Sequence, residues 1–174
     1  MKFSDRKIDI TTHYNWPSKF YFEKIINEVI KIGNLFDKNK KILDFGCGEK
    51  YLQKKLKRKI YNYDINPKYN EISNWEKLFF DYVIFNAVIM YFDKYEFINI
   101  LNQIKTKNPN CEIIICMSKE TILNRLLAYM CFRFDWLKNT KLSYENQIQL
   151  IEKNLYIKKK INIWGLSEVL LCSF

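Results

Sequence analysis

The sequence has little of several features that mark particular classes of protein. Its 174 residues include four glycines, three prolines and one histidine, and they show no internal repeat and no low-complexity linker. No apolar run is long enough to cross a bilayer, and no apolar signal segment opens the chain. The composition, 48% hydrophobic and 28% charged, is that of a globular protein rather than a disordered one. We therefore expect a single cytoplasmic domain, residues 1–174, with no transmembrane segment.

Cysteine pairs of the kind that bind zinc are also absent. The five cysteines form no CxxC pair, and their number is odd. They are Cys47, Cys111, Cys116, Cys131 and Cys172. Most of them lie inside apolar runs, where a thiol behaves as a small hydrophobic side chain. We expect reduced thiols and no metal site.

Acidic residues are too few to balance the basic ones. The sequence has 29 Lys and Arg against 19 Asp and Glu, a net charge of +10. Basic residues gather at 54–59, with the sequence KKLKRK, and again at 158–160. Such a charge would suit a nucleic acid, or an anionic membrane surface contacted peripherally. The alternative is the general enrichment in Lys, Asn and Ile that an AT-rich genome produces, with both runs as solvated faces.

Strand and helix patterns alternate along the chain. Pro17 opens a helix with roughly helical spacing of apolar residues. Residues 111–117 form a nearly continuous apolar run, which is typical of a strand buried on both faces of a parallel sheet. We expect strands at 41–45, 60–64, 82–86, 111–117, 156–163 and 168–174, and helices at 17–33, 49–57, 94–105, 119–137 and 143–154. This order predicts an α/β fold whose mostly parallel sheet closes with an antiparallel hairpin.

The strongest ligand-binding signal is the segment ILDFGCGE at residues 42–49, in a predicted strand–turn–helix. Glycines let the backbone approach a ligand closely, and a helix N-terminus offers free N–H groups to a carboxylate. The segment resembles the first motif of class I S-adenosylmethionine-dependent methyltransferases, in which an acid precedes alternating glycines. The resemblance implies that Asp44 helps to hold the methionine amino group. It also implies that Gly46, Cys47 and Gly48 lie against the methionine portion and the ribose of the cofactor.

A second acid, Asp64, ends the next predicted strand, sixteen residues after Gly48. The family has an Asp or Glu here that binds the two ribose hydroxyls, and the resemblance implies that Ile65 packs on the adenine. Ordinary core packing is the alternative for Ile65. A dinucleotide-binding domain uses an acid in the same way, but it expects a GxGxxG pattern. Here Gly46 and Gly48 are followed by Tyr51 at the third position, which favours the methyltransferase interpretation.

Residues 80–91 resemble the family's fourth strand and the loop that leaves it, which faces both cofactor and substrate. The resemblance implies that Asn86 lines the cofactor site and Val88 the substrate site, whereas Asp81 is structural. The branch that methylates exocyclic amines of adenine or cytosine carries N/D-P-P-Y/F here. This sequence has NAVI at 86–89, which disfavours that chemistry. No Pro-Cys pair follows the strand, which argues against methylation of cytosine at C5.

The resemblance covers nearly the whole chain and implies a Rossmann-like, doubly wound, mostly parallel sheet with a C-terminal antiparallel hairpin. Two features differ from the family pattern. Lys50 occupies the third glycine position of the first motif, and only sixteen residues separate Asp64 from Asp81. We therefore expect the helix after the second strand to be shortened or missing, with a short third strand near 69–72. The residues that would replace the acid at the adenine amino group are Ser73, Asn74 or Trp75.

Two segments are candidates for substrate contacts. Residues 1–36 would form an N-terminal lid and helix, in which the sole histidine, His13, would act as general base. Tyr14 and Trp16 would line the substrate pocket, and a surface role is the alternative for His13. The helical insertion 119–139 follows the fifth strand, where family members carry substrate lids, and Met130 lies on its apolar stripe. A helix docked on the core and a membrane-surface helix are the alternatives for this insertion.

The resemblance implies an enzyme that uses S-adenosylmethionine and releases S-adenosylhomocysteine. The expected reaction is O- or N-methylation of a small-molecule, saccharide or lipid-linked acceptor. Two alternatives stay open. A catalytically silent binding module with the same fold would explain the shortened middle of the chain. An RNA methyltransferase would explain the positive charge.

Overall fold

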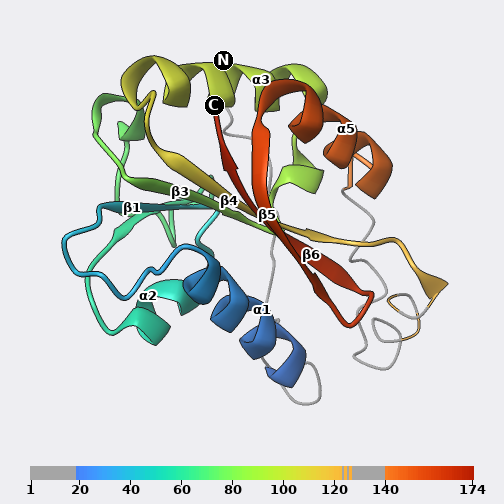
Figure 1. The fold of residues 1–174 in the computed structure, drawn as a ribbon. Coiled ribbons are helices and arrows are strands. Elements are labelled where there is room, and N and C mark those ends of the chain that lie inside the picture. The colour runs from blue at the N-terminus through green and yellow to red at the C-terminus, as the bar shows by residue number, and fades with distance from the viewer. Residues whose placement is uncertain (1–18, 123, 125, 127–139) are drawn as a thin grey trace.

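The computed structural model describes residues 19–122, 124, 126 and 140–174 (Figure 1). Within these residues, six strands form one sheet in the order β2-β1-β3-β4-β6-β5. The parallel strands are β1 (Ile42–Phe45), β2 (Tyr61–Tyr63), β3 (Tyr82–Asn86) and β4 (Glu112–Ser118). The antiparallel end consists of β6 (Ser167–Ser173), which pairs with β4, and β5 (Tyr156–Ile163), which pairs with β6. The predicted α/β sheet with its closing hairpin is confirmed.

Helices cover both faces of this sheet (Figure 1). One face carries α1 (Lys19–Ile32) and α2 (Tyr51–Leu56), and the other carries α3 (Lys94–Lys107) and α5 (Tyr144–Asn154). Successive strand residues point to opposite faces, so each central strand feeds two cores. Ile84 and Ile114 pack with α1, whereas Phe85 and Ile115 pack with α3 and α5. All four side chains are fully buried, which is why these strands are apolar without alternation.

Short-range signals set the ends of the helices. Asp93 and Glu96 form a capping box at the start of α3, in which each carboxylate accepts the other residue's backbone N–H at 2.8 Å. Ser143 caps α5 by accepting the N–H of Asn146. A 3-10 turn, η2 (Ile89–Tyr91), leads from β3 into the start of α3. None of the described helices combines the length and the apolar character that crossing a membrane requires.

The segment between β2 and β3 departs from the family pattern, as predicted. Residues 64–81 contain no α-helix, and their one helical element is the 3-10 turn η1 (Trp75–Lys77). The prediction of a third strand near 69–72 is wrong, because this segment contacts β2 through a single backbone hydrogen bond, from Glu71 N to Asn62 O at 3.1 Å. Sixteen residues are enough to return the chain to β3, but they are too few to add a paired strand and its connections.

Candidate functional site

The order of strands creates a switch point next to β1. From β1 the chain passes to β2 on one side, and it later returns to β3 on the other side. Crevices at the carboxyl ends of strands beside such a point are where open α/β sheets bind ligands. Phe45 is aligned with Tyr63 of β2 and with Phe85 of β3. The residues that follow this row therefore meet at one edge of the sheet, and they are Gly46, Asp64 and Asn86.

The turn after β1 depends on two glycines with positive φ. Gly46 has φ +80°, and its N–H donates to the carbonyl of Tyr63 at 2.8 Å. A Cβ at Gly46 would lie 2.6 Å from Cγ2 of Val88, so a side chain there would collide with the loop after β3. Gly48 has φ +48°, and no atom lies within 4 Å of the position that its Cβ would take. The turn thus packs tightly against Val88 at Gly46, whereas the space next to Gly48 is empty.

Lys50 keeps the backbone conformation that a third glycine would have provided. Its φ is +60°, in the left-handed region that glycine adopts most easily, and α2 begins directly after it. The Nζ atom of Lys50 contacts the carboxylate of Glu71 at 2.7 Å. The substitution therefore preserves the shape of the turn and ties it to the segment that follows β2.

Asp44 is the most unusual side chain of this edge. It lies in the middle of β1 with 4% of its surface exposed, and no described residue donates a hydrogen bond to its carboxylate. Burial, with a smaller contribution from the charge of Asp64, raises the pKa of Asp44 to about 7. Burial and the same two carboxylates also raise the pKa of the Cys47 thiol, so Cys47 is no thiolate nucleophile. A buried carboxylate without a partner requires a cation or a proton.

Asp64 organises the turn and retains free acceptor positions. One carboxylate oxygen accepts the N–H of Gly48 and the other accepts the N–H of Asn66, both at 2.8 Å. A carboxylate offers about four lone-pair positions, so about two remain for a ligand with hydroxyl groups. Asp64 and its neighbour Ile65 are both half-buried. Two carboxylates and an open glycine turn therefore suit a ligand that carries both a cationic group and vicinal hydroxyls, as S-adenosylmethionine does.

The third strand contributes a strained loop to the same edge. Asn86 ends β3 and is half-buried, and Ala87 follows it with φ +54°. A non-glycine residue in this region is held there by its surroundings, here by the hydrogen bond from its N–H to Cys116 O at 3.0 Å. This turn directs Val88 against Gly46.

Other predicted residues lie elsewhere or outside the described structure. Trp75 is buried in the core and packs edge-on against Phe45, with ring centroids 5.2 Å apart, so it does not replace the acid at the adenine. Ser73 and Asn74 are exposed on the surface. The residues that lie outside the described part of the chain are His13, Tyr14, Trp16 and Met130.

A cluster of three hydroxyl groups next to this edge is not predicted from the sequence. Tyr21 of α1 hydrogen-bonds to Ser167, whose Oγ lies 3.4 Å from Oγ of Ser118 at the end of β4. Burial raises the pKa of Tyr21 to about 12, so it is a neutral hydroxyl. Asn86 is aligned with Cys116, two residues before Ser118, so the cluster continues the site along the α1 face of the sheet. No local sequence motif predicts this hydroxyl cluster, because its members come from distant parts of the sequence.

A second unpredicted cluster lies on the opposite face. Glu168 is 3% exposed and contacts Nζ of Lys119 at 2.8 Å and Nζ of Lys160 at 2.7 Å, and it also accepts from the hydroxyl of Tyr144. Burial alone would raise the pKa of Glu168, but these hydrogen bonds outweigh burial and lower the pKa. With three donors, Glu168 is a structural anion rather than a base.

Comparison with solved structures identifies the fold. A protein from Pyrococcus horikoshii OT3 matches with a TM-score of 0.63 at 15% identity, over 93% of this chain and 94% of that one. Magnesium protoporphyrin IX methyltransferase from Synechocystis PCC 6803, solved with S-adenosylhomocysteine, matches with a TM-score of 0.58 at 14% identity, over 92% and 88%. Other matching structures are methyltransferases too. The chain therefore has the fold of class I S-adenosylmethionine-dependent methyltransferases, as its motifs predict.

The fold does not by itself specify a reaction. A structure described as a pericyclic reaction enzyme also matches, with a TM-score of 0.56 at 12% identity, over 86% of this chain and 46% of that one. No protein-family model matches the sequence, and no curated protein matches it. Function must be argued from the site.

Proposed function

We propose that this chain is a methyltransferase that binds S-adenosylmethionine at the carboxyl ends of β1, β2 and β3. The observation that carries the proposal is Asp44, a buried carboxylate with no donor among the described residues, beside an open glycine turn. An unpaired buried carboxylate is costly and is retained where a ligand supplies the missing positive charge. The α-ammonium group of a methionine moiety supplies it, in agreement with the role that the motif resemblance implies for Asp44.

The other residues of this edge have separate roles in the proposal. Asp64 binds the ribose hydroxyls with its two remaining acceptor positions, and Ile65 packs on the adenine. Gly48 leaves room for the ligand because its Cβ position is empty. Asn86 borders the reacting end of the cofactor. When bound, the cofactor supplies an electrophilic methyl group on a positively charged sulfur, and the protein positions the acceptor for in-line attack and excludes water.

We further propose that the acceptor is a small, saccharide or lipid-linked molecule methylated on oxygen or nitrogen. The half-buried hydroxyls of Tyr21 and Ser118 lie beyond Asn86, next to the fully buried Ser167, and offer polar contacts to such an acceptor. The roles of Val88, Tyr14, Trp16 and Met130 in binding it, and of His13 as base, remain predictions. A His13→Ala variant with the same kcat as wild type would refute the role of His13 as general base.

A catalytically silent binding module is the second candidate. It is favoured by the segment between β2 and β3, which has no paired strand to position an acid at the adenine amino group, and in which Glu71 is bound by Lys50 and Asn62 and Trp75 is buried in the core. Turnover of labelled S-adenosylmethionine with a panel of acceptors separates the two candidates. Binding of the cofactor without turnover of any acceptor favours the silent module.

A pair of glycine variants tests the cofactor site. Gly48 and Gly165 both have positive φ and both have empty space at the Cβ position, but Gly165 lies in the turn between β5 and β6. Alanine should therefore strain both turns alike. In calorimetric titrations, we expect Gly48→Ala to weaken binding of S-adenosylmethionine and S-adenosylhomocysteine at least about tenfold, and Gly165→Ala to leave it unchanged. Equal effects of the two variants, or no binding by folded wild type, would overturn the proposal.

A further inference from the structure

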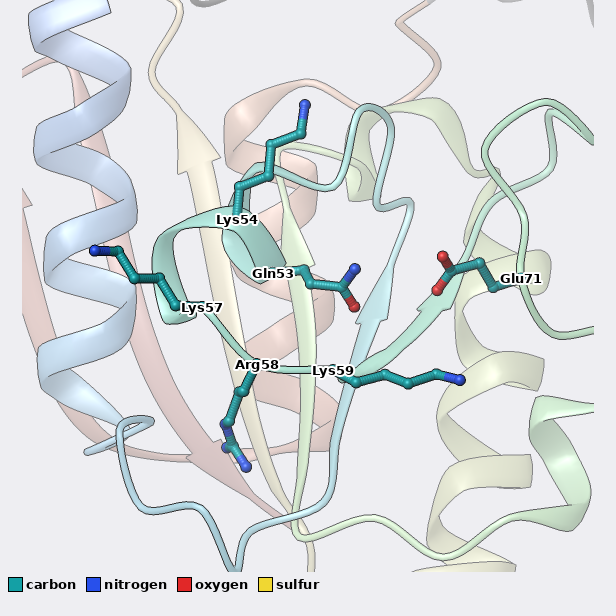
Figure 2. Close-up of a pocket in the computed structure, with 6 residues that line it drawn as sticks. All are labelled: Gln53, Lys54, Lys57, Arg58, Lys59 and Glu71. Atoms are coloured by element: carbon teal, nitrogen blue, oxygen red, sulfur yellow. The ribbon is translucent and has the colours of Figure 1, made fainter.

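A hollow of about 560 Å³ on the outer side of α2 is bordered mainly by basic side chains (Figure 2). Its positive residues, called here the basic surface, are Lys54, Lys57, Arg58 and Lys59. They come from the last turn of α2 and from the connection to β2. Figure 2 shows their side chains spreading outward, with Lys57 directed towards α1 and Lys59 towards the side of Glu71. Lys54 lies in the last turn of α2, and Lys57 is the C-cap residue of that helix, with φ +51°.

The four positive groups of the basic surface share their hollow with one described carboxylate, that of Glu71, which lies close enough to Lys59 for their charges to attract. Lys54, Lys57 and Lys59 are exposed, and none of them forms an ion pair with a described carboxylate. The one acid at the rim, Glu71, is already occupied by Nζ of Lys50 at 2.7 Å and by the side-chain amide of Asn62 at 2.6 Å. Elsewhere, several exposed or half-buried lysines contact carboxylates, namely Lys24, Lys119, Lys141, Lys158 and Lys160. The basic surface thus differs from these paired lysines in bringing several exposed positive charges to one hollow.

Arg58 is the basic residue of this surface whose position is fixed by hydrogen bonds. Its guanidinium donates to the carbonyls of Leu35 at 3.1 Å, Lys38 at 2.9 Å and Lys40 at 3.0 Å. Carbonyl groups hold the guanidinium without cancelling its charge. They also fix the loop before β1, where the ring of Phe36 is 63% exposed. Arg58 therefore joins the basic surface to the loop that precedes β1.

We propose that the basic surface binds the phosphate backbone of a nucleic acid. A membrane fits it less well, because the apolar residues of α2, Leu52 and Leu56, are only 2% and 7% exposed and face the core. A helix that binds a lipid surface must expose its apolar face instead. The proposal goes beyond the methyltransferase function and does not rest on it, because none of the four basic residues belongs to the cofactor site.

The dependence of binding on salt measures how many phosphates are neutralised. On a single strand, the slope of log K against log[salt] is about −0.7 for each phosphate. Four basic side chains predict a slope of about −3, so wild type should lose about 50-fold in affinity between about 50 and 200 mM salt. The variant Lys54→Gln/Lys57→Gln/Lys59→Gln retains Arg58 alone. It should bind more weakly throughout, with a slope of about −0.7 and a loss of about threefold.

A matched variant separates this surface from the overall charge. Lys94→Gln/Lys105→Gln/Lys153→Gln removes the same charge from exposed lysines of α3 and α5, on the other face of the sheet. Fluorescence polarisation with single-stranded RNA and single-stranded DNA of mixed sequence should show near wild-type binding by this variant. Equal losses in the two variants would overturn the proposal, as would equally tight binding to polyglutamate or to phosphatidylserine vesicles, or no binding at low salt. Titration with S-adenosylmethionine reports separately on the cofactor site, and the Lys54/Lys57/Lys59 variant should leave it intact.

Discussion

Replacement of Asp44 by Asn should stabilise the free protein while removing the cation site that we propose. Asp44 is 4% exposed, and burial together with the charge of Asp64 raises its pKa from 3.8 to about 7. A carboxyl group with a higher pKa in the folded state holds its proton more tightly there than in the unfolded chain. Ionisation therefore opposes folding. The contribution of Asp44 to stability is most favourable below the unfolded pKa of 3.8, declines as the pH rises, and levels off above about pH 7.

The size of the effect follows from the two pKa values. A tenfold change in proton affinity corresponds to about 1.4 kcal/mol, so a rise from 3.8 to about 7 costs about 4 kcal/mol once Asp44 is ionised. Between about pH 5 and about pH 8, about 3 kcal/mol of this cost develops. For a chain of this length, about 1 kcal/mol changes Tm by about 2–4 °C. Relative to wild type, Asp44→Asn should therefore gain about 5–10 °C in Tm over this pH range.

Circular dichroism melts at both pH values, without ligand, measure the difference. Glu145→Gln removes an exposed carboxylate from α5 and serves as the control for a change in net charge. At the higher pH, S-adenosylmethionine should raise the Tm of wild type, because it binds only the folded state, and should leave that of Asp44→Asn unchanged. If the Tm difference between Asp44→Asn and wild type is the same at both pH values, the reasoning about the buried carboxylate is wrong.

Three further predictions concern other parts of the structure. Gly46→Ala should lower the free energy of unfolding by about 1–3 kcal/mol, because a Cβ would lie 2.6 Å from Val88. In urea denaturation, the double variant Gly46→Ala/Val88→Ala should recover part of the lost stability. A double variant no more stable than Gly46→Ala would contradict the contact. Lys57→Gly should raise the free energy of unfolding by about 0.5–1 kcal/mol, because Lys57 has a φ of +51°, which glycine adopts without strain. The same variant should weaken RNA binding, because it removes a positive charge. A less stable variant would contradict the first expectation, and unchanged RNA affinity would contradict the second. Glu168→Gln should cost about 1–3 kcal/mol, because Lys119 and two other donors lose their anion. Since the pKa of Glu168 is lowered from 4.5, this contribution is present above that value and is lost as the pH falls below it; a difference from wild type that persists in acid would refute it.

The resemblance to the methyltransferase motifs grouped Asp44, Gly46, Asp64 and Asn86 before any coordinates were known. The parallel strands of the structure place Gly46, Asp64 and Asn86 at one edge of the sheet, with Asp44 inside β1 next to it. The start of α2 was less accurate. Helical pattern placed it near Glu49, whereas the left-handed conformation of Lys50 delays it to Tyr51.

Apolar periodicity and strand-ending motifs by themselves determined the order of the strands and the parallel sheet with its antiparallel end, and the spacing of Asp64 and Asp81, compared with the family pattern, predicted the missing helix after β2. These features depend on residues that are neighbours in the sequence. Only the tertiary structure brought Tyr21 to Ser118 and Ser167, enclosed Glu168 between two lysines, and left Asp44 without a described donor. Contacts between distant segments, and the burial that sets a pKa, depend on how helices pack across the sheet, and no local pattern in the sequence records that packing.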